Sequence, residues 1–169
     1  VVLKAWASKR AGSNFSWKPL DELVESGKGA DFVLPLPAPI NDDSMWRNLV
    51  AETVQHLSGR VQRFEVLASR GADDRYLDQY ETAVWAAYGA DPKANLGGPG
   101  SDWQSAGISA LVNRCKERQV PLSFVSWRVG VQGPEDLLQS AEAVDRILEK
   151  ASLQEPPEMM ITGWHGERE

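Results

Sequence analysis

Short apolar runs alternate with longer amphipathic stretches along almost the whole chain, and this alternation limits the possible folds more strongly than any other feature. Six apolar runs are typical of β-strands, at residues 1–7, 31–36, 63–68, 93–97, 122–127 and 159–164. Between them, apolar side chains recur at helical spacing within residues 19–25, 46–57, 76–88, 108–115 and 137–148. Strands that are joined by helices run parallel with right-handed crossovers, so the sequence predicts one parallel sheet.

Two architectures place helices between parallel strands, the (β/α)8 barrel and the open doubly wound sheet. A complete barrel has eight strands and about 250 residues, whereas this chain has 169 residues and six strand candidates. We therefore expect a single domain over residues 1–169 that forms a partial (β/α)8 barrel, with the first and last strands lacking. An open parallel doubly wound sheet is the alternative. In both architectures the functional loops follow the C-terminal ends of the strands.

Charge and composition exclude several classes of function. The net charge is −6 and the 18 basic residues form no stripe that could follow phosphates, so nucleic acid is not an expected partner. No apolar run reaches the roughly 20 residues of a membrane-spanning helix, and we expect no membrane association. His56, His165 and the single Cys115 do not have the spacing of a zinc site, so no metal or other cofactor is expected. The chain begins at Val1, which suggests that an upstream stretch was removed. Both a cytoplasmic location and secretion with a cleaved leader therefore remain open.

A glycine-rich segment, residues 97–102 (GGPGSD), follows the fourth predicted strand. Such a segment can hold phosphate with its backbone amides when it opens a helix. Here neither phosphate-binding motif is complete, Pro99 lacks an amide donor, and no lysine follows. The sequence therefore predicts a structural turn. Cys115 lies in an apolar helical pattern, which favours a buried thiol over a nucleophile.

Six short segments, taken in order, carry a resemblance to a known enzyme family. They are residues 15–21 (FSWKPLD), 46–50 (WRNLV) with His56 and Arg60, 64–66 (FEV), 97–99 (GGP), 124–127 (FVSW), and 160–162 (MIT) with Trp164. In this order they resemble motifs of glycoside hydrolase family 39, the β-xylosidase group among the retaining (β/α)8 glycosidases. The resemblance implies a carbohydrate-directed barrel in which residues 1–7 lie near the second strand and residues 159–164 near the seventh.

The two catalytic positions of that family are not acidic in this chain. The family's WNEP segment aligns with residues 67–70, which places Ser69 where the acid/base glutamate stands, and the family's nucleophile glutamate aligns with Gly163. Retaining hydrolysis needs two carboxyl groups about 5–5.5 Å apart. Neither a serine nor a glycine supplies one. The resemblance therefore implies a glycosidase-like barrel that has lost hydrolysis.

Aromatic and basic residues near strand ends indicate a carbohydrate-binding surface. The candidates are Trp6, Trp127, Arg128, Trp164 and His165. Aromatic rings offer a large contact area to the C–H face of a sugar, and the basic side chains can donate hydrogen bonds to hydroxyl groups. The same tryptophans would also suit packing at the top of a barrel. Trp46 and Trp85 fall in helical patterns and are expected in the core.

We expect an oligosaccharide or glycoside as the ligand of this chain, and two alternatives remain open. The first is an active O-glycosyl hydrolase with relocated acids, for which the loop candidates are Asp73, Asp74, Asp102 and Glu167. Glu65 is expected deep in the barrel, buried and hydrogen-bonded, because it lies about 13 Å below Ser69 along the strand. The second alternative is a structural piece of a larger barrel protein. Another segment or subunit would then cover the open sheet edges, because bare edges invite aggregation.

Overall fold

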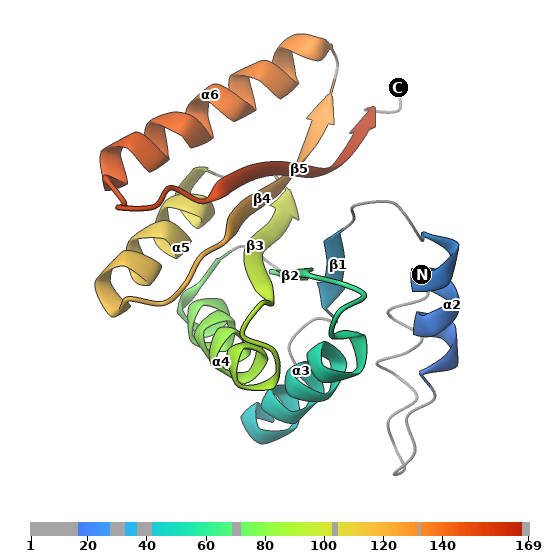
Figure 1. Ribbon diagram of the computed structural model, residues 1–169. Coiled ribbons are helices and arrows are strands. Elements are labelled where there is room, and N and C mark those ends of the chain that lie inside the picture. The colour runs from blue at the N-terminus through green and yellow to red at the C-terminus, as the bar shows by residue number, and fades with distance from the viewer. Residues whose placement is uncertain are drawn as a thin grey trace.

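The structure is a computed structural model that describes residues 17–27, 33–36, 42–68, 72–102, 105–131 and 133–166. Helices and strands alternate throughout this part of the chain (Figure 1). The helices are α2 (Lys18–Ser26), α3 (Asp43–Leu57), α4 (Asp74–Ala90), α5 (Ser105–Arg118) and α6 (Pro134–Ala151). The strands are β1 (Val33–Leu36), β2 (Arg63–Val66), β3 (Asn95–Asp102), β4 (Phe124–Val131) and β5 (Glu158–Gly166). The strand predicted at residues 1–7 lies outside the described residues.

The five strands form one parallel sheet in the order β1-β2-β3-β4-β5. Each strand therefore pairs with the next one along the chain, and helices α3 to α6 lie around the outside of the sheet (Figure 1). A doubly wound sheet instead reverses its strand order at a switch point. The order thus confirms the predicted partial (β/α)8 barrel and shows that the doubly wound alternative is wrong.

The sheet is curled so strongly that side chains of β2 and β5 meet, although β3 and β4 lie between these strands. Thr162 Oγ1 of β5 donates a hydrogen bond to Glu65 Oε1 of β2 over 2.7 Å. At the N-terminal ends of the same strands, an Arg63 guanidinium nitrogen lies 3.3 Å from Glu158 Oε2. Neighbouring strands are about 4.8 Å apart, so a flat sheet would separate β2 from β5 by about 14 Å. The curl creates an inner face that is distinct from the helix-covered outer face.

The outer layer holds the apolar core between the helices and the sheet. Trp46 of α3 is fully buried, as expected, and its Nε1 donates to the Gln79 carbonyl oxygen of α4 over 3.1 Å. Tyr80 of α4 lies against the sheet, where its hydroxyl contacts the carbonyl oxygens of Leu96 and Pro121 at 3.3 and 3.2 Å. These hydrogen bonds satisfy polar groups that burial would otherwise leave without a partner. They fix both helices against the strands.

The other tryptophan predicted in the core, Trp85, is 50% exposed, so that prediction is wrong. The buried face of α4 runs through Tyr76, Tyr80, Val84 and Ala87. Trp85 follows Val84 by one residue and is therefore turned about 100° around the helix. The exposure of Trp85 therefore follows from its position on the face of α4 that points away from the core.

The glycine-rich segment predicted as a turn is part of strand β3, with a cis peptide bond between Gly98 and Pro99. Its glycines allow close approach instead of a change of direction. A Cβ at Gly97 would lie 2.3 Å from the Phe124 ring of β4, and one at Gly98 would lie 2.3 Å from the Tyr76 hydroxyl. No side chain fits in either place, so the glycines permit Phe124 and Tyr76 to pack against the backbone of β3.

Two segments of the family resemblance meet where α2 contacts α3. His56 Nε2 lies 2.8 Å from Asp21 Oδ1, and Arg60 donates to the same oxygen over 2.7 Å. The Trp17 ring stacks on His56 with ring centroids 4.4 Å apart. The hydrogen bonds from Arg60 and His56 lower the pKa of Asp21 below its usual value. This cluster fastens α2 to the outer layer and takes no part in the inner face.

Cys115 of α5 is 4% exposed, and burial raises the pKa of its thiol to about 12. The nucleophile is the thiolate, which such a pKa disfavours at neutral pH. The prediction of a buried thiol is confirmed. None of the helices in the described part of the chain is long and apolar enough to cross a bilayer.

Substitution of Gly97 tests the packing of β3. We expect Gly97→Ala to lower the free energy of unfolding by about 1–3 kcal/mol, because the added methyl group overlaps the Phe124 ring and carbonyl. The matched control is Gly89→Ala in α4, where a Cβ meets nothing within 4 Å. There the change should raise stability by up to about 1 kcal/mol. Urea unfolding followed by circular dichroism measures both, and an undiminished stability of Gly97→Ala would contradict the packing described.

Candidate functional site

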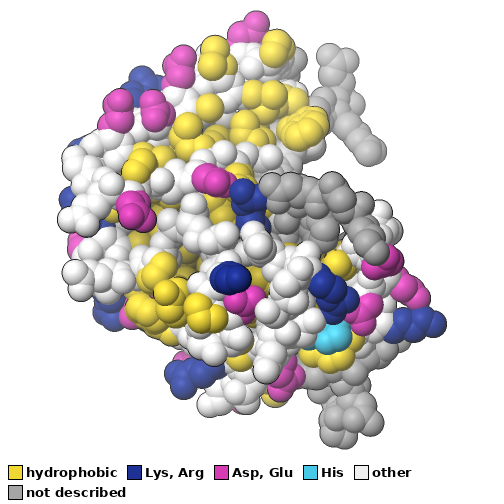
Figure 2. All heavy atoms as spheres, viewed as in Figure 1, with side chains coloured by type: hydrophobic (Ala, Val, Ile, Leu, Met, Phe, Trp, Pro, Cys, Tyr) yellow, Lys and Arg dark blue, Asp and Glu magenta, His cyan; other side chains and the backbone are white. Residues whose placement is uncertain are grey.

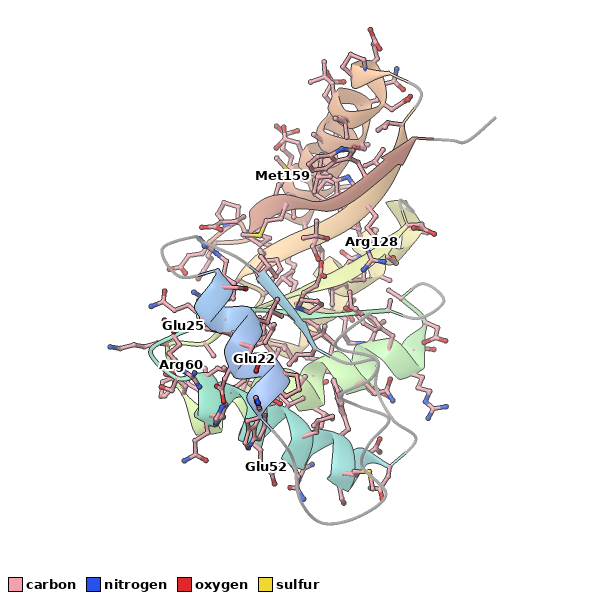
Figure 3. The ribbon with its side chains drawn as sticks, turned by 90° about the vertical axis from the view of Figure 1, so that its right-hand side faces the viewer. Glu22, Glu25, Glu52, Arg60, Arg128 and Met159 are labelled. Atoms are coloured by element: carbon pink, nitrogen blue, oxygen red, sulfur yellow. The ribbon has the colours of Figure 1, made fainter. Side chains whose placement is uncertain are left out.

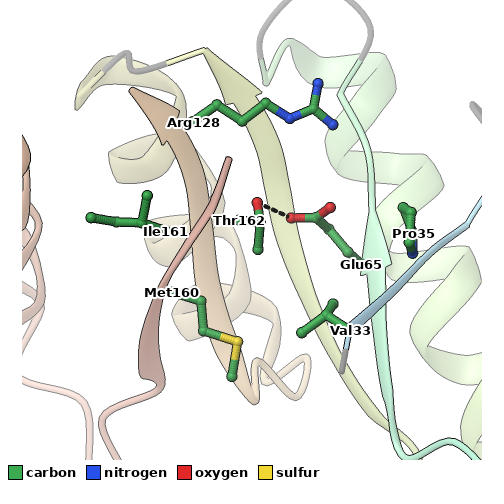
Figure 4. A pocket seen from close by; sticks show the side chains of 7 residues that line it. All are labelled: Val33, Pro35, Glu65, Arg128, Met160, Ile161 and Thr162. Atoms are coloured by element: carbon green, nitrogen blue, oxygen red, sulfur yellow. Dashed lines mark hydrogen bonds between the residues drawn. The ribbon is translucent and has the colours of Figure 1, made fainter. Parts of the chain in front are cut away.

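A cavity of about 460 Å³ opens on the inner face of the curled sheet. Its lining comes from four of the five strands (Figure 4). The lining residues are Val33, Pro35, Glu65, Arg128, Met160, Ile161 and Thr162. The volume falls in the range of small-molecule sites, and four of the seven lining residues are apolar while three are polar. We refer to this space as the inner-face cavity.

Glu65 supplies a carboxylate to the inner-face cavity. Its side chain is 3% exposed, and Oε1 accepts the hydrogen bond from the Thr162 hydroxyl. Gly100 of β3 makes the room for it, since a Cβ there would lie 2.6 Å from Glu65 Cδ. The backbone of Gly100 also has a φ of +57°, which favours glycine. Burial and hydrogen bonding of Glu65 are confirmed, whereas its place in a cavity lining was not expected.

A β-bulge brings Thr162 to Glu65. The pairing of β4 with β5 shifts between Trp127↔Ile161 and Arg128↔Gly163, so Thr162 is one extra residue on β5. Its hydroxyl therefore reaches Glu65 on the inner face. Thr162 belongs to a segment of the family resemblance but was not predicted as a site residue, because a bulge leaves no sign in the alternation of apolar and polar residues. The same holds for the apolar lining residues Val33, Pro35 and Met160.

Arg128, one of the predicted binding residues, lies on β4 with its side chain in the inner-face cavity (Figure 4). It is directly paired with Gly163 of β5. A Cβ at Gly163 would lie 3.2 Å from Arg128 Cγ and 3.4 Å from Cδ. The methylene groups of Arg128 thus occupy the space beside Gly163, the position at which the family resemblance places a nucleophile.

The two described tryptophans among the candidate binding residues do not line the cavity. Trp127 is 1% exposed and packs on the outer face among residues of α5 and α6, where its Nε1 lies 3.1 Å from Ser140 Oγ. Trp164 is 70% exposed and pairs with Val129, which also belongs to the outer cluster. Successive side chains of a strand point to opposite faces, so Trp127 and Arg128 cannot share one surface. The expected aromatic platform is therefore not part of the site that we derive.

Some of the remaining candidate residues lie outside the part of the chain that the structure describes. Trp6, Ser69 and Glu167 lie outside the described residues, and for His165 only the backbone of β5 is described. Asp73 caps α4, where its Oδ1 accepts from the Tyr76 amide over 2.8 Å. Asp74 is exposed and lies 3.3 Å from Arg114, and Asp102 is exposed at the end of β3. None of these three aspartates lines the inner-face cavity.

A scan with protein-family models and a search of curated proteins find no match to this sequence. Solved structures with the same fold do exist. A glucosidase from Croceicoccus marinus superimposes with a TM-score of 0.76 and 21% identity, over 89% of this chain and 38% of its own. The protein N2152 from Neocallimastix frontalis superimposes with a TM-score of 0.69 and 12% identity. The match covers 89% of this chain and 41% of N2152. A thermostable xylanase mutant from Cellvibrio japonicus superimposes with a TM-score of 0.61 and 18% identity. The match covers 90% of this chain and 56% of the xylanase.

These likenesses establish the fold as that of glycosidase and xylanase barrels, which agrees with the coarse part of the family resemblance. The chain spans 38% to 56% of the length of the three proteins named. It therefore corresponds to a part of such a barrel, and the inner-face cavity lies on the side that faces the barrel axis. At these identities the comparison concerns the fold alone.

Removal of the Thr162 hydroxyl tests the anchor of Glu65. We expect Thr162→Val to lower the free energy of unfolding by about 1–3 kcal/mol, because it leaves a buried carboxylate oxygen without its donor. Thr82→Val is the control, since the Thr82 hydroxyl bonds the Asp78 carbonyl oxygen at the exposed surface of α4. Thermal and urea unfolding of both variants give the comparison. Equal losses in the two would mean that the hydroxyl contributes nothing specific to the inner face.

Proposed function

We propose that this chain is a glycoside-hydrolase-like barrel segment that binds an oligosaccharide or glycoside in the inner-face cavity and does not hydrolyse it. The observation that supports binding is the polar lining, in which a carboxylate, a hydroxyl and a guanidinium group from β2, β5 and β4 converge. Sugar hydroxyl groups donate to carboxylates and accept from guanidinium groups. The apolar side chains of Val33, Pro35 and Met160 offer contact area to the C–H surface of a sugar.

The proposal of inactivity follows from the carboxyl groups. Retaining hydrolysis requires a pair of them about 5–5.5 Å apart. Among the residues that line the inner-face cavity, Glu65 is the single acid, and its Oε1 is bonded to Thr162. Gly163 offers no nucleophile beside Arg128. Membership of the β-xylosidase group, family 39, is the finer proposal and rests on the sequence segments together with Ser69 and Gly163 at the two catalytic positions.

Ligand-observed NMR tests binding and cleavage in one sample. The purified chain is mixed with xylo-, gluco- and manno-oligosaccharides and followed over several days. We expect saturation transfer to at least one sugar and no new reducing-end signals. Slow release of shortened products would overturn the proposal of inactivity, and Asp102, exposed at the end of β3, would be the first acid to replace.

A pair of isosteric variants assigns the binding to the cavity. We expect Glu65→Gln to weaken binding roughly tenfold, because a charged acceptor for hydroxyl groups becomes neutral while its amide oxygen still accepts from Thr162. Glu52→Gln changes the same chemistry on the exposed side of α3, distant from Arg128 in Figure 3, and should leave binding unchanged. Sugar binding that is equal in both variants would remove the inner-face cavity from the proposal.

The outer side of β5 supports a second part of the proposal, that another segment or subunit covers it. Trp164 of β5, Met159 of β5 and Leu138 of α6 are exposed, and Figure 2 shows hydrophobic side chains gathered where Figure 1 places α6 and β5. Exposed apolar surface of this kind is typical of an interaction site.

Sedimentation velocity over a range of concentrations tests this coverage. We expect the chain alone to self-associate, and Trp164→Ser to reduce the association. The control is Trp85→Ser, which removes the same side chain from the exposed face of α4, where Trp85 is 50% exposed against 70% for Trp164. A wild-type chain that stays monomeric at all concentrations would count against the coverage of β5.

A further inference from the structure

We infer that helix α4 carries a second binding site, for a neutral glycan, formed by the exposed rings of Trp85 and Tyr88. These two side chains are called the α4 ring pair below. They lie on the outer, helix-covered side of the sheet, so the site is separate from the inner-face cavity and does not depend on it. The glycan would stack its C–H surface on the rings and place hydroxyl groups at the indole N–H and the phenol O–H.

The α4 ring pair is exposed although α4 has packing neighbours on both sides. Trp85 and Tyr88 are each 50% exposed. In the outer layer α4 lies between α3 and α5 (Figure 1), and both Trp46 of α3 and Arg114 of α5 form hydrogen bonds with it. The exposure of the rings is therefore a property of a helix that is already packed, unlike the exposure of Trp164 on the last strand of the sheet.

The space beside the indole ring of Trp85 is open. Residues three and four apart are neighbours on a helix, with Cβ atoms about 5–6 Å apart, so Trp85 adjoins both Tyr88 and Gly89. A Cβ at Gly89 would meet nothing within 4 Å. Long side chains of a helix lean over the preceding turn, so a larger residue at position 89 would cover the indole. Glycine at this position leaves the ring pair accessible from that side.

The polar atoms of the ring pair are available for a ligand. Neither the indole nitrogen of Trp85 nor the hydroxyl of Tyr88 has a hydrogen bond to any described residue. The buried aromatic side chains Trp46 and Tyr80 instead donate to backbone carbonyl oxygens. An aromatic ring with a free polar tip suits a partner that is apolar on one side and polar on the other. A pyranose unit has this character, with C–H groups on its faces and hydroxyl groups at its edge.

The charges beside the ring pair favour a neutral ligand. One and two turns before Trp85 on the same helix, Glu81 pairs with Arg118 at 3.4 Å and Asp78 pairs with Arg114 at 2.9 Å. Stacking of nucleic-acid bases needs a positively charged groove for the phosphates, and anionic lipids attract basic side chains. Both arginines are already bound to carboxylates, and the chain carries a net charge of −6.

The size of the ring pair favours a small ligand over a protein partner. Full burial of an aromatic side chain covers about 150–250 Å², so two half-exposed rings offer about 200 Å² together. A specific protein interface buries about 800 Å² on each partner. The surface of the ring pair is thus sufficient for a short stack of sugar units, and the ion pairs that flank it do not extend it with apolar area.

Nuclear magnetic resonance of the indole N–H groups tests the site directly. The intact chain, labelled with nitrogen-15, is titrated separately with xylohexaose, cellohexaose and mannohexaose. Trp85→Phe identifies the Trp85 signal by its disappearance. We expect the Trp85 signal to shift in a saturable manner with at least one of the three glycans, because the ligand covers that ring and bonds its N–H.

A pair of variants at Gly89 tests whether the open ring surface is the contact. Gly89→Leu keeps both rings but covers the indole, and should weaken the affinity read at the Trp85 signal roughly tenfold. Gly89→Ala is the matched control and should leave that affinity unchanged, because its methyl group is too short to reach the ring. Both changes replace a helical glycine by a better helix former, and circular dichroism verifies that the variants are folded.

The outcomes distinguish this site from the inner-face cavity. No shift of the Trp85 signal with any of the three glycans would overturn the inference, even where other signals report binding in the cavity. An unchanged affinity in Gly89→Leu would overturn it too. In Glu65→Gln, which is expected to weaken the cavity, the Trp85 shift should persist, and its loss there would show that no separate site exists. A reduced self-association of Trp85→Ser in sedimentation would identify the ring pair as a protein contact instead.

Discussion

Each strand of this sheet turns alternate side chains toward the helices and toward the inner face, and the other features of the molecule depend on that division. In β4 the outward residues are Val125, Trp127 and Val129, which pack with α5 and α6. Arg128 between them is left to the inner side. Because the outer layer contains the large apolar residues, helix packing stabilises the curled sheet. The inner face is then free to carry polar groups such as Glu65 and Thr162.

The same division explains what the sequence could predict. Helical spacing and apolar runs located the described helices and strands, because the outer layer is a continuous apolar core and leaves a periodic signal. Both packing and sugar binding were open for Trp127 in the sequence, and its burial in the outer cluster favours packing, since it and Arg128 are adjacent on one strand and face opposite sides. The glycines of β3 were taken for a turn because their role depends on Phe124 and Tyr76, which lie far along the chain. The meeting of Thr162 with Glu65 depends on curl and a bulge, and neither is encoded in a local pattern.

Fold and chemistry are separate matters in barrels of this kind, since many functions share one scaffold. Sequence segments around the strands and helices resemble a glycosidase pattern closely enough to suggest the architecture, and a solved glucosidase and a solved xylanase share it at 21% and 18% identity. The segments that resemble the family include structural contacts, such as Asp21 with His56 and Arg60. The proposed loss of hydrolysis concerns the inner face instead, where the stem of Arg128 lies beside Gly163.

The buried thiol of Cys115 makes the molecule a reporter of its own opening. With 4% exposure and a pKa of about 12, the thiol is shielded from alkylating reagents while α5 lies on the sheet. Labelling then proceeds only through openings that free this helix, and its rate in native buffer counts how often they occur. Because Cys115 is the single cysteine of the chain, the modified mass identifies the site without digestion. A bound ligand that stabilises the sheet would slow the same reaction. The labelling rate would therefore report both local unfolding and ligand binding.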